Sequence, residues 1–296
     1  MKNFTMISKR QLKSKIQSTG NIKQMTRAME LVAATKMRKA QDRALRARPY
    51  AKHALSLLSR IIALASLREF EGTLWKERTE GKVCLVVVTS DKGLSGSFNN
   101  AVLRLSFEKA QEYQKNGETV EVAAVGKKAR DFFLNRNIPV ATSFLRFSDI
   151  VGLEDVRPLA DWVLNAYATK TYKKVIFCST QFVSALINHA QFRQLLPLDQ
   201  EELSQEPTNH VDYVLEPSPK EIFEKVSEEL ARVAILHFLF ESNAAEHSSR
   251  MVAMKNATEN ASDLLESLTL ELNKARQSAI TQELSEVTGA ANALSA

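Results

Sequence analysis

One turn in the sequence has residue types that could bind a phosphate. Residues 91–97 read DKGLSGS and follow the apolar run at residues 82–90, KVCLVVVTS. In doubly wound folds, turns of this kind bind phosphates because the next helix presents free N–H groups at its start. A P-loop, however, closes with Gly-Lys-Ser/Thr, and a dinucleotide-binding turn reads G-x-G-x-x-G. The segment matches neither pattern, so we interpret it as a tight connection into a helix.

Side chains that usually ligate metals or act as nucleophiles are scattered along the chain. No two of the five histidines are spaced i, i+4, and both cysteines lie inside apolar runs. No nucleophile elbow or local Ser/His/Asp signature is present. The sequence therefore predicts no catalytic, cofactor-binding or metal-binding residue on this chain. The residues considered are His53, His189, His210, His237, His247, Cys84 and Cys178.

Positive charge is concentrated at one end of the chain. Residues 1–52 contain 14 Lys and Arg against two acids, a net charge of +12, whereas the other 244 residues carry −6. Such a segment favours an acidic partner, which could be nucleic acid, anionic lipid or an acidic protein surface. The basic stretch at residues 36–39 lacks the interleaved aromatic residues of many nucleic-acid patches. Charge alone does not choose among the three partners.

Glycine and proline divide the chain into three zones. Thirteen of the sixteen Gly and Pro residues fall between Gly72 and Pro219. Turns are therefore expected in the middle and long helices on both flanks. We predict an N-terminal coiled-coil helix at 1–70, a central α/β domain at 71–217, and a C-terminal coiled-coil helix at 218–296.

The C-terminal flank predicts one very long helix. Ser218 can cap it, Pro219 suits the first helical position, and Glu221 can complete a capping box. Residues 220–288 contain neither Gly nor Pro and would span roughly 100 Å as a helix. Residues 287–296 are small and apolar and are expected to fray. A seam with 3,4 spacing, typical of a coiled coil, runs through Leu230, Val233, His237, Phe240, Ala244, His247, Met251, Met254, Thr258, Ala261, Leu265, Leu268, Leu272 and Ala275.

The N-terminal flank carries a matching seam, with many alanines that allow a partner helix to approach closely. Pro49 is expected to kink this helix because it removes a hydrogen bond. Since a folded domain separates the two flanks, their helices are predicted to pair antiparallel. The seam comprises Ile22, Met25, Met29, Ala33, Met37, Ala40, Ala44, Ala47, Ala51, Ala54, Leu58 and Ile61.

The middle zone alternates between strand and helix patterns. Strands are expected at residues 82–90, 119–125, 139–144 and 173–178, with an edge strand at 210–215. Helices are expected at residues 98–115, 127–135 and 155–171. This alternation predicts a small doubly wound, Rossmann-like sheet.

Several long motifs resemble the ATP synthase gamma subunit family. They are residues 25–41 (MTRAMELVAATKMRKAQ), 246–258 (EHSSRMVAMKNAT) and 273–284 (NKARQSAITQEL), with looser matches at 89–96 and 195–198. The resemblance covers nearly the whole chain. Residues 20–24 (GNIKQ) depart from the family's usual order just before Met25.

The resemblance implies a central stalk rotor in a proton-transporting rotary ATP synthase. Its helices would turn inside a hexameric ring of alpha and beta subunits, and its α/β domain would contact the epsilon subunit and the c-ring. Mg-ATP and ADP would bind the alpha and beta subunits, with no cofactor on this chain. Ring contacts or coil packing would involve Met29, Lys36, Arg38, Arg250, Arg276, Gln277, Thr281 and Glu283.

Location is a further expectation. No run of 18 apolar residues suggests a membrane span, and the N-terminus resembles neither a signal nor a transit peptide. We therefore expect one copy per complex, peripheral to the bacterial plasma membrane on its cytoplasmic side, with no nucleic acid bound. Two rival classes remain open: a basic coiled-coil nucleic-acid binder, and a nucleotide-dependent enzyme built on the α/β domain.

Overall fold

The computed structural model describes residues 9–64, 74–198, 216 and 218–295. The chain forms two compact units. One comprises Ala33–Arg250, and the other is built from the described residues of Met1–Val32 and Met251–Ala296. The three zones predicted at 1–70, 71–217 and 218–296 were drawn from the distribution of Gly and Pro, whereas the two units are defined by contacts within the fold. The division into three zones therefore stays a prediction.

The terminal helices are long and uninterrupted. Helix α1 spans Lys9–Leu64, 56 residues, and continues through Pro49. Helix α6 spans Pro219–Ser295, 77 residues. It begins as predicted, because the Glu221 N–H donates to Ser218 Oγ at 3.3 Å and the Ser218 hydroxyl donates to a Glu221 carboxylate oxygen. Its end differs from the expected fraying, since the helix continues past Gly289.

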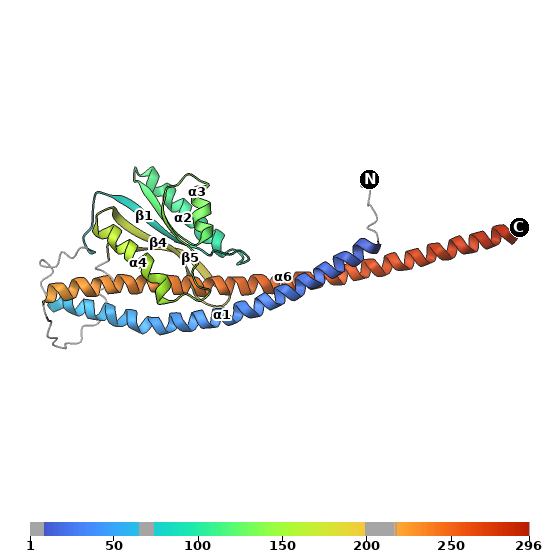
Figure 1. Ribbon diagram of the computed structural model, residues 1–296, viewed down its shortest axis with the longest axis horizontal. Helices are drawn as coiled ribbons and strands as arrows, with labels where there is room; N and C mark the ends of the chain where they lie inside the picture. Colours follow the sequence, from blue (N-terminus) through green and yellow to red (C-terminus); the bar gives the residue numbers. More distant parts are fainter. Residues whose placement is uncertain (1–8, 65–73, 199–215, 217, 296) are drawn as a thin grey trace. The chain divides into compact units, whose positions relative to one another are not determined.

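The stretch of chain between these two helices forms a five-stranded sheet in the order β3-β2-β1-β4-β5 (Figure 1). The strands are β1 Lys82–Val88, β2 Val120–Val125, β3 Val140–Phe144, β4 Tyr172–Phe182 and β5 Asn188–Leu196. The first four are parallel, and β5 pairs antiparallel with β4. The sheet is therefore mixed, with one strand that the sequence reading missed. The edge strand predicted at 210–215 lies outside the described residues.

Helices cover both faces of the sheet. Helices α2 (Phe98–Lys115) and α3 (Lys127–Leu134) pack on one face, around the inward side chains of β1 such as Val83 and Leu85. Helix α4 (Leu153–Ala168) and the first part of α6 pack on the other, around Val86 and Phe177. Because β1 is buried on both faces, it reads as a continuous apolar run. The predicted combination of an α/β domain with long helices is confirmed.

In the Ala33–Arg250 unit, the C-terminal seam is buried or half-buried as predicted. Ala33, Met37, Ala40 and Ala44 of α1 are buried as well, and Ala44 belongs to the same core cluster as the start of α6. The side chains of Ala47, Ala51, Ala54, Leu58 and Ile61 lie outside the described part of the chain.

In the other unit, the predicted N-terminal seam is wrong at two positions, Ile22 and Met25, whereas Met29 is half-buried. Ile22 and Met25 are 45% and 58% exposed, whereas Leu12, Thr19 and Thr26, seven residues apart, are buried. Thr26 Oγ1 lies 2.8 Å from Thr258 Oγ1 of α6, so the buried hydroxyls are hydrogen-bonded across the pair. Small side chains allow the helices to approach closely, and the bond removes the penalty of burying the hydroxyls.

Across the described ranges, no helix combines the length and apolarity that crossing a bilayer requires.

Candidate functional site

The structure brings two of the predicted contact residues into one neighbourhood. Lys36 of α1 pairs with Asp149 at 2.7 Å, and Arg250 of α6 pairs with Glu246 at 2.6 Å and lies 3.4 Å from His247 Nδ1. Both sets of contacts lie around the loop between β3 and α4. Of the other predicted contact residues, Arg38 is exposed on α1 in the same unit. In the second unit, Met29 is half-buried, and Arg276, Gln277, Thr281 and Glu283 are exposed on α6.

The turn after β1 is held by bonds within the chain. The Asp91 carboxylate accepts the Lys127 N–H at the start of α3 and the Arg146 N–H of the β3–α4 loop, both at 2.8 Å. Asn99 Oδ1 accepts the buried Ser90 N–H at 3.0 Å. These residues therefore tie the carboxyl end of β1 to two neighbouring elements, as the interpretation of a tight connection requires.

Asp149, which the sequence reading did not single out, is contacted from three directions. Its carboxylate accepts Lys36 Nζ at 2.7 Å and Lys92 Nζ at 3.3 Å. Its backbone carbonyl lies 2.5 Å from His247 Nε2 and 3.4 Å from the Asn243 amide. The hydrogen bond from Lys36 is the main reason that the pKa of this carboxyl lies below its ordinary value of 3.8. Asp149 is therefore ionised at neutral pH.

His247 is buried with its ring between Asp149 and Arg250. Burial is the main cause that holds its pKa below the ordinary value of 6.5. The neutral ring then has one donor and one acceptor. Nε2 donates to the Asp149 carbonyl, and Nδ1 faces the Arg250 guanidinium at 3.4 Å. This arrangement fixes the tautomer and links Arg250 to Asp149 through the imidazole.

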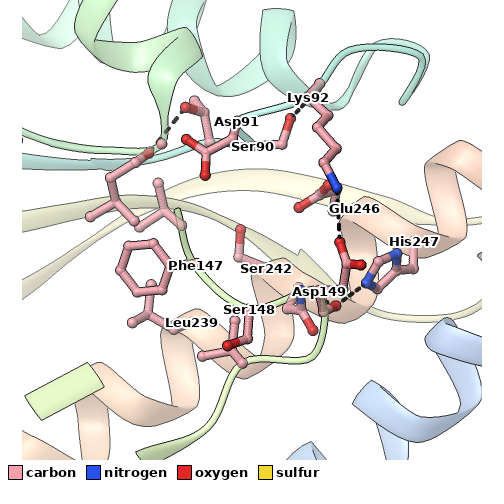
Figure 2. A pocket seen from close by; sticks show the side chains of 16 residues that line it. Ser90, Asp91, Lys92, Phe147, Ser148, Asp149, Leu239, Ser242, Glu246 and His247 are labelled. Carbon is pink, nitrogen blue, oxygen red and sulfur yellow. Dashed lines mark hydrogen bonds and ion pairs between the residues drawn. The ribbon is translucent and has the colours of Figure 1, made fainter. Parts of the chain in front are cut away.

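A small cavity of about 70 Å³ opens beside these residues, between the carboxyl ends of β1 and β2, the β3–α4 loop and α6. Figure 2 shows Asp91 on one side of it and Ser242 of α6 on the other, with Phe147 and Leu239 beside them. Ser242 is buried, and its hydroxyl has no hydrogen-bond partner among the residues that the structure describes. The crevice lies where doubly wound sheets usually bind ligands, but this volume is less than half that of a cavity that holds benzene, about 150 Å³.

Groups suited to metal or redox chemistry are sparse in the described part of the chain. No cluster of three or more His, Cys, Asp or Glu residues with metal-ligand geometry occurs there. Cys84 and Cys178 are free and fully buried in the sheet. Burial raises the pKa of both thiols, that of Cys178 to about 12.

The end of α6 is a second candidate surface. All residues from 281 to 290 are exposed, including Leu284 at 62% and Val287 at 68%. A contiguous patch of exposed apolar side chains often marks a contact with another molecule, and Leu284 and Val287 are neighbours on one face of the helix. Arg276 and Gln277 are also exposed on α6, and the Thr281 hydroxyl donates to the Gln277 carbonyl of its own helix at 3.0 Å.

The fold defines a class of protein in which a small mixed α/β domain is inserted, along the chain, between two long terminal helices. Within that class, a family model described as ATP synthase matches residues 8–294. The chain therefore belongs to the ATP synthase family, and its curated relatives carry the name ATP synthase gamma chain.

Two of those relatives illustrate the similarity. The ATP synthase gamma chain of Chloroflexus aurantiacus is 39% identical over 290 residues, which cover 98% of this chain and 99% of the relative. That of Legionella pneumophila is 33% identical, covering 98% of this chain and all of the relative. The resemblance read from the terminal motifs is confirmed at this level.

Solved structures share the fold. A chain of the Tetrahymena thermophila mitochondrial ATP synthase central stalk and c-ring superposes with a TM-score of 0.58 at 24% identity, covering 79% of this chain and 99% of that one. A chain of the Euglena gracilis mitochondrial ATP synthase gives a TM-score of 0.65 at 17% identity, covering 97% and 94%.

Proposed function

We propose that this chain is the central stalk rotor of a bacterial rotary ATP synthase and carries no catalytic site of its own. In this role it couples rotation of a membrane c-ring to ATP synthesis and hydrolysis at the beta subunits. The observation that carries the proposal is the continuous 77-residue helix α6, whose residues 281–290 are all exposed. A long helix with an exposed end can reach into a partner and transmit force along its axis.

The proposed partners are a hexameric ring of alpha and beta subunits, an epsilon subunit and the c-ring. The names of the relatives and the central stalk assemblies among the solved structures support this set. The net charge of +12 on residues 1–52 also suits an acidic protein surface. Mg-ATP and ADP would then bind the alpha and beta subunits, and this chain would hold no cofactor.

We place the complex at the bacterial plasma membrane, with this chain as a peripheral subunit on the cytoplasmic side. The bacterial relatives support that location. Within the complex, the exposed Arg276 and Gln277 are proposed to hydrogen-bond a ring subunit. Lys36 and Arg250, which are held by their own chain, are proposed to contribute to packing and positioning instead.

The test is assembly of the purified chain with the alpha and beta subunits of its own cell. We expect a stable complex whose ATP hydrolysis depends on this chain and is inhibited by azide. A chain cut before Gln277 should assemble but hydrolyse ATP more slowly. Changing Arg276 and Gln277 to alanine should lower ATP synthesis more than assembly.

Two outcomes would contradict the proposal. Failure to assemble, together with no effect on hydrolysis, would remove the rotor role and direct attention to the basic helix. DNA binding that weakens steeply with salt would then favour the nucleic-acid class. Stoichiometric nucleotide binding by the isolated chain would favour an enzyme built on the α/β domain.

A further inference from the structure

The loop between β3 and α4, residues 145–152, is a meeting point within the Ala33–Arg250 unit. It receives polar contacts from α1, from the turn after β1, and from α6. These elements are distant in sequence, since the Lys36–Asp149 bond joins residues 113 apart. A loop with these contacts can hold the elements in one arrangement.

The contacts from α1 are both basic side chains. Lys36 reaches the Asp149 carboxylate at 2.7 Å, and Arg43 donates to the Ile150 and Val151 carbonyls at 3.1 and 2.7 Å. The residues of α1 buried in the same stretch are mostly alanines, with Met37 among them. Apolar burial is non-directional, so a seam of small side chains resists separation better than it resists sliding. Charge-assisted hydrogen bonds have fixed directions and set the register.

The contacts from α6 reach the same residue on its backbone. His247 donates to the Asp149 carbonyl, and the Asn243 amide lies 3.4 Å from that oxygen. His247 is buried, and Arg250, which pairs with Glu246, lies 3.4 Å from its Nδ1. Asp149 thus joins α1 through its carboxylate and α6 through its carbonyl, and Figure 2 shows the α6 side of this junction.

The sheet holds the loop from a third side. Lys92, in the turn after β1, lies 3.3 Å from the Asp149 carboxylate (Figure 2). Asp91 accepts the N–H of Arg146, whose φ of 62° lies in the left-handed region. Such a conformation is costly for a residue with a Cβ and persists only where neighbours enforce it. The loop is therefore anchored to the carboxyl edge of β1.

We propose that Asp149 is a positioning residue that locks α1 and α6 to the α/β sheet, so that force applied to the sheet domain reaches both helices in a fixed register. The effect of Asp149 on force transmission rests on the rotor function proposed above. The positioning of α1 and α6 by Asp149 is a property of this chain alone. The Lys36 and Asp149 side chains are 31% and 51% exposed, so their ion pair adds little to stability. Its removal should change the register of α1 and leave the fold intact.

The first measurement is a distance distribution between spin labels on α1 and on α3. Lys39 and Lys127 are exposed sites for labels once each is changed to Cys, and the native Cys84 and Cys178 are buried. In assembled complexes we expect a narrow distribution for the parent chain and a broader one for Asp149→Asn. Asp149→Glu keeps the carboxylate and should restore most of the narrow distribution.

A matched control distinguishes the specific effect of losing the Asp149 contacts from the effect of losing any exposed ion pair. Asp131 pairs with Arg130 inside α3, and its side-chain exposure of 43% is close to that of Asp149. Asp131→Asn should leave the distribution narrow. An unchanged distribution in Asp149→Asn, or equal broadening in Asp131→Asn, would overturn the proposal.

The second measurement is ATP-driven proton pumping relative to ATP hydrolysis on the same vesicles. Asp149→Asn should keep near-parental hydrolysis but pump several-fold fewer protons per ATP, and Asp149→Glu should recover coupling. If Asp149→Asn broadens the spin-label distances but pumps as many protons per ATP as the parent, then the position of α1 has no effect on coupling. Absence of chain-dependent hydrolysis in the parent would instead contradict the proposed function, and the label distances would still decide the lock.

Discussion

The Nζ atom of Lys36 lies 2.7 Å from Oδ2 of Asp149, although 113 residues separate them in sequence. Lys36 belongs to the first helix of the chain, and Asp149 belongs to the loop that follows the third strand. Through the Asp149 carbonyl the same residue also accepts from His247, on the last helix. Three segments from the beginning, middle and end of the chain therefore meet at one residue.

Gly126 should not tolerate a side chain. Its φ is +88°, and an added Cβ would lie 2.3 Å from the Thr89 carbonyl oxygen. We expect Gly126→Ala to combine backbone strain of about 1–3 kcal/mol, because a residue with a Cβ rarely adopts φ 88° with ψ 148°, with overpacking of roughly 1–3 kcal/mol. Gly117 is the matched control, because its φ is +80° but nothing lies within 4 Å of an added Cβ. Urea unfolding of both variants checks this, and equal losses would contradict the steric argument.

The buried Trp75 should depend on its hydroxyl partner. Trp75 Nε1 donates to Ser227 Oγ at 2.8 Å, and both residues are buried. Ser227→Ala leaves the indole N–H unpaired, so the free energy of unfolding should fall by about 1–3 kcal/mol. Ser106→Ala is the control, since the buried Ser106 hydroxyl donates to Val102 O of its own helix and its other side-chain partner is the Cys178 thiol, which forms only weak hydrogen bonds. A loss in Ser106→Ala as large as in Ser227→Ala would mean that the indole bond contributes little.

Cys84 and Cys178 should be inert in the folded chain. Both thiols are fully buried, and burial raises their pKa values, that of Cys178 to about 12. Because the thiolate is the reactive form, we expect a thiol reagent to modify neither residue under native conditions at neutral pH. Both should react in denaturant. Rapid native modification of either thiol would show that the sheet opens locally.

Acidification should weaken the Ala33–Arg250 unit through His247. Burial depresses the pKa of this ring below 6.5 in the folded state, and the groups facing it are the Asp149 carbonyl, Glu246, Arg250 and Lys36. A base with a depressed pKa binds its proton more readily when unfolded, so its contribution to stability is complete above 6.5 and declines as the pH falls below that value.

The measurement is the free energy of unfolding across this pH window for the parent chain and for His247→Gln. The variant lacks the titrating ring, so its stability should change less between pH 7 and the acid end of the window. The pKa of Asp149 is also depressed, from 3.8, so its contribution is lost only at lower pH. Identical pH slopes in the two proteins would remove His247 as the cause.

Local chemistry was sufficient to predict the helices. The start of α6 follows from Ser218, Pro219 and Glu221, which satisfy free N–H groups within one turn. Helix α2, Phe98–Lys115, has the bounds that were predicted for a helix after the Gly-containing turn. The start and end of a helix depend on residues only a few positions away in the sequence, so a short stretch of sequence is enough to predict them.

The sheet was predicted less completely. Strand β5 carries polar side chains along much of its length and has no strong strand pattern. It becomes a strand because β4 offers it a hydrogen-bonding edge, from Val175 to Phe182. Pairing across a sheet supplies bonds that the sequence of β5 alone does not reveal.

The sequence by itself determined the family, the two long helices and the buried strands, because each rests on local spacing or on long motifs. Only the tertiary structure decided that Thr19 and Thr26 are buried while Ile22 and Met25 are exposed. It also decided that Lys36, Asp149 and His247 meet. The physical reason is the same in both cases: burial and ion pairing depend on which distant segment lies opposite, and no local pattern encodes that neighbour.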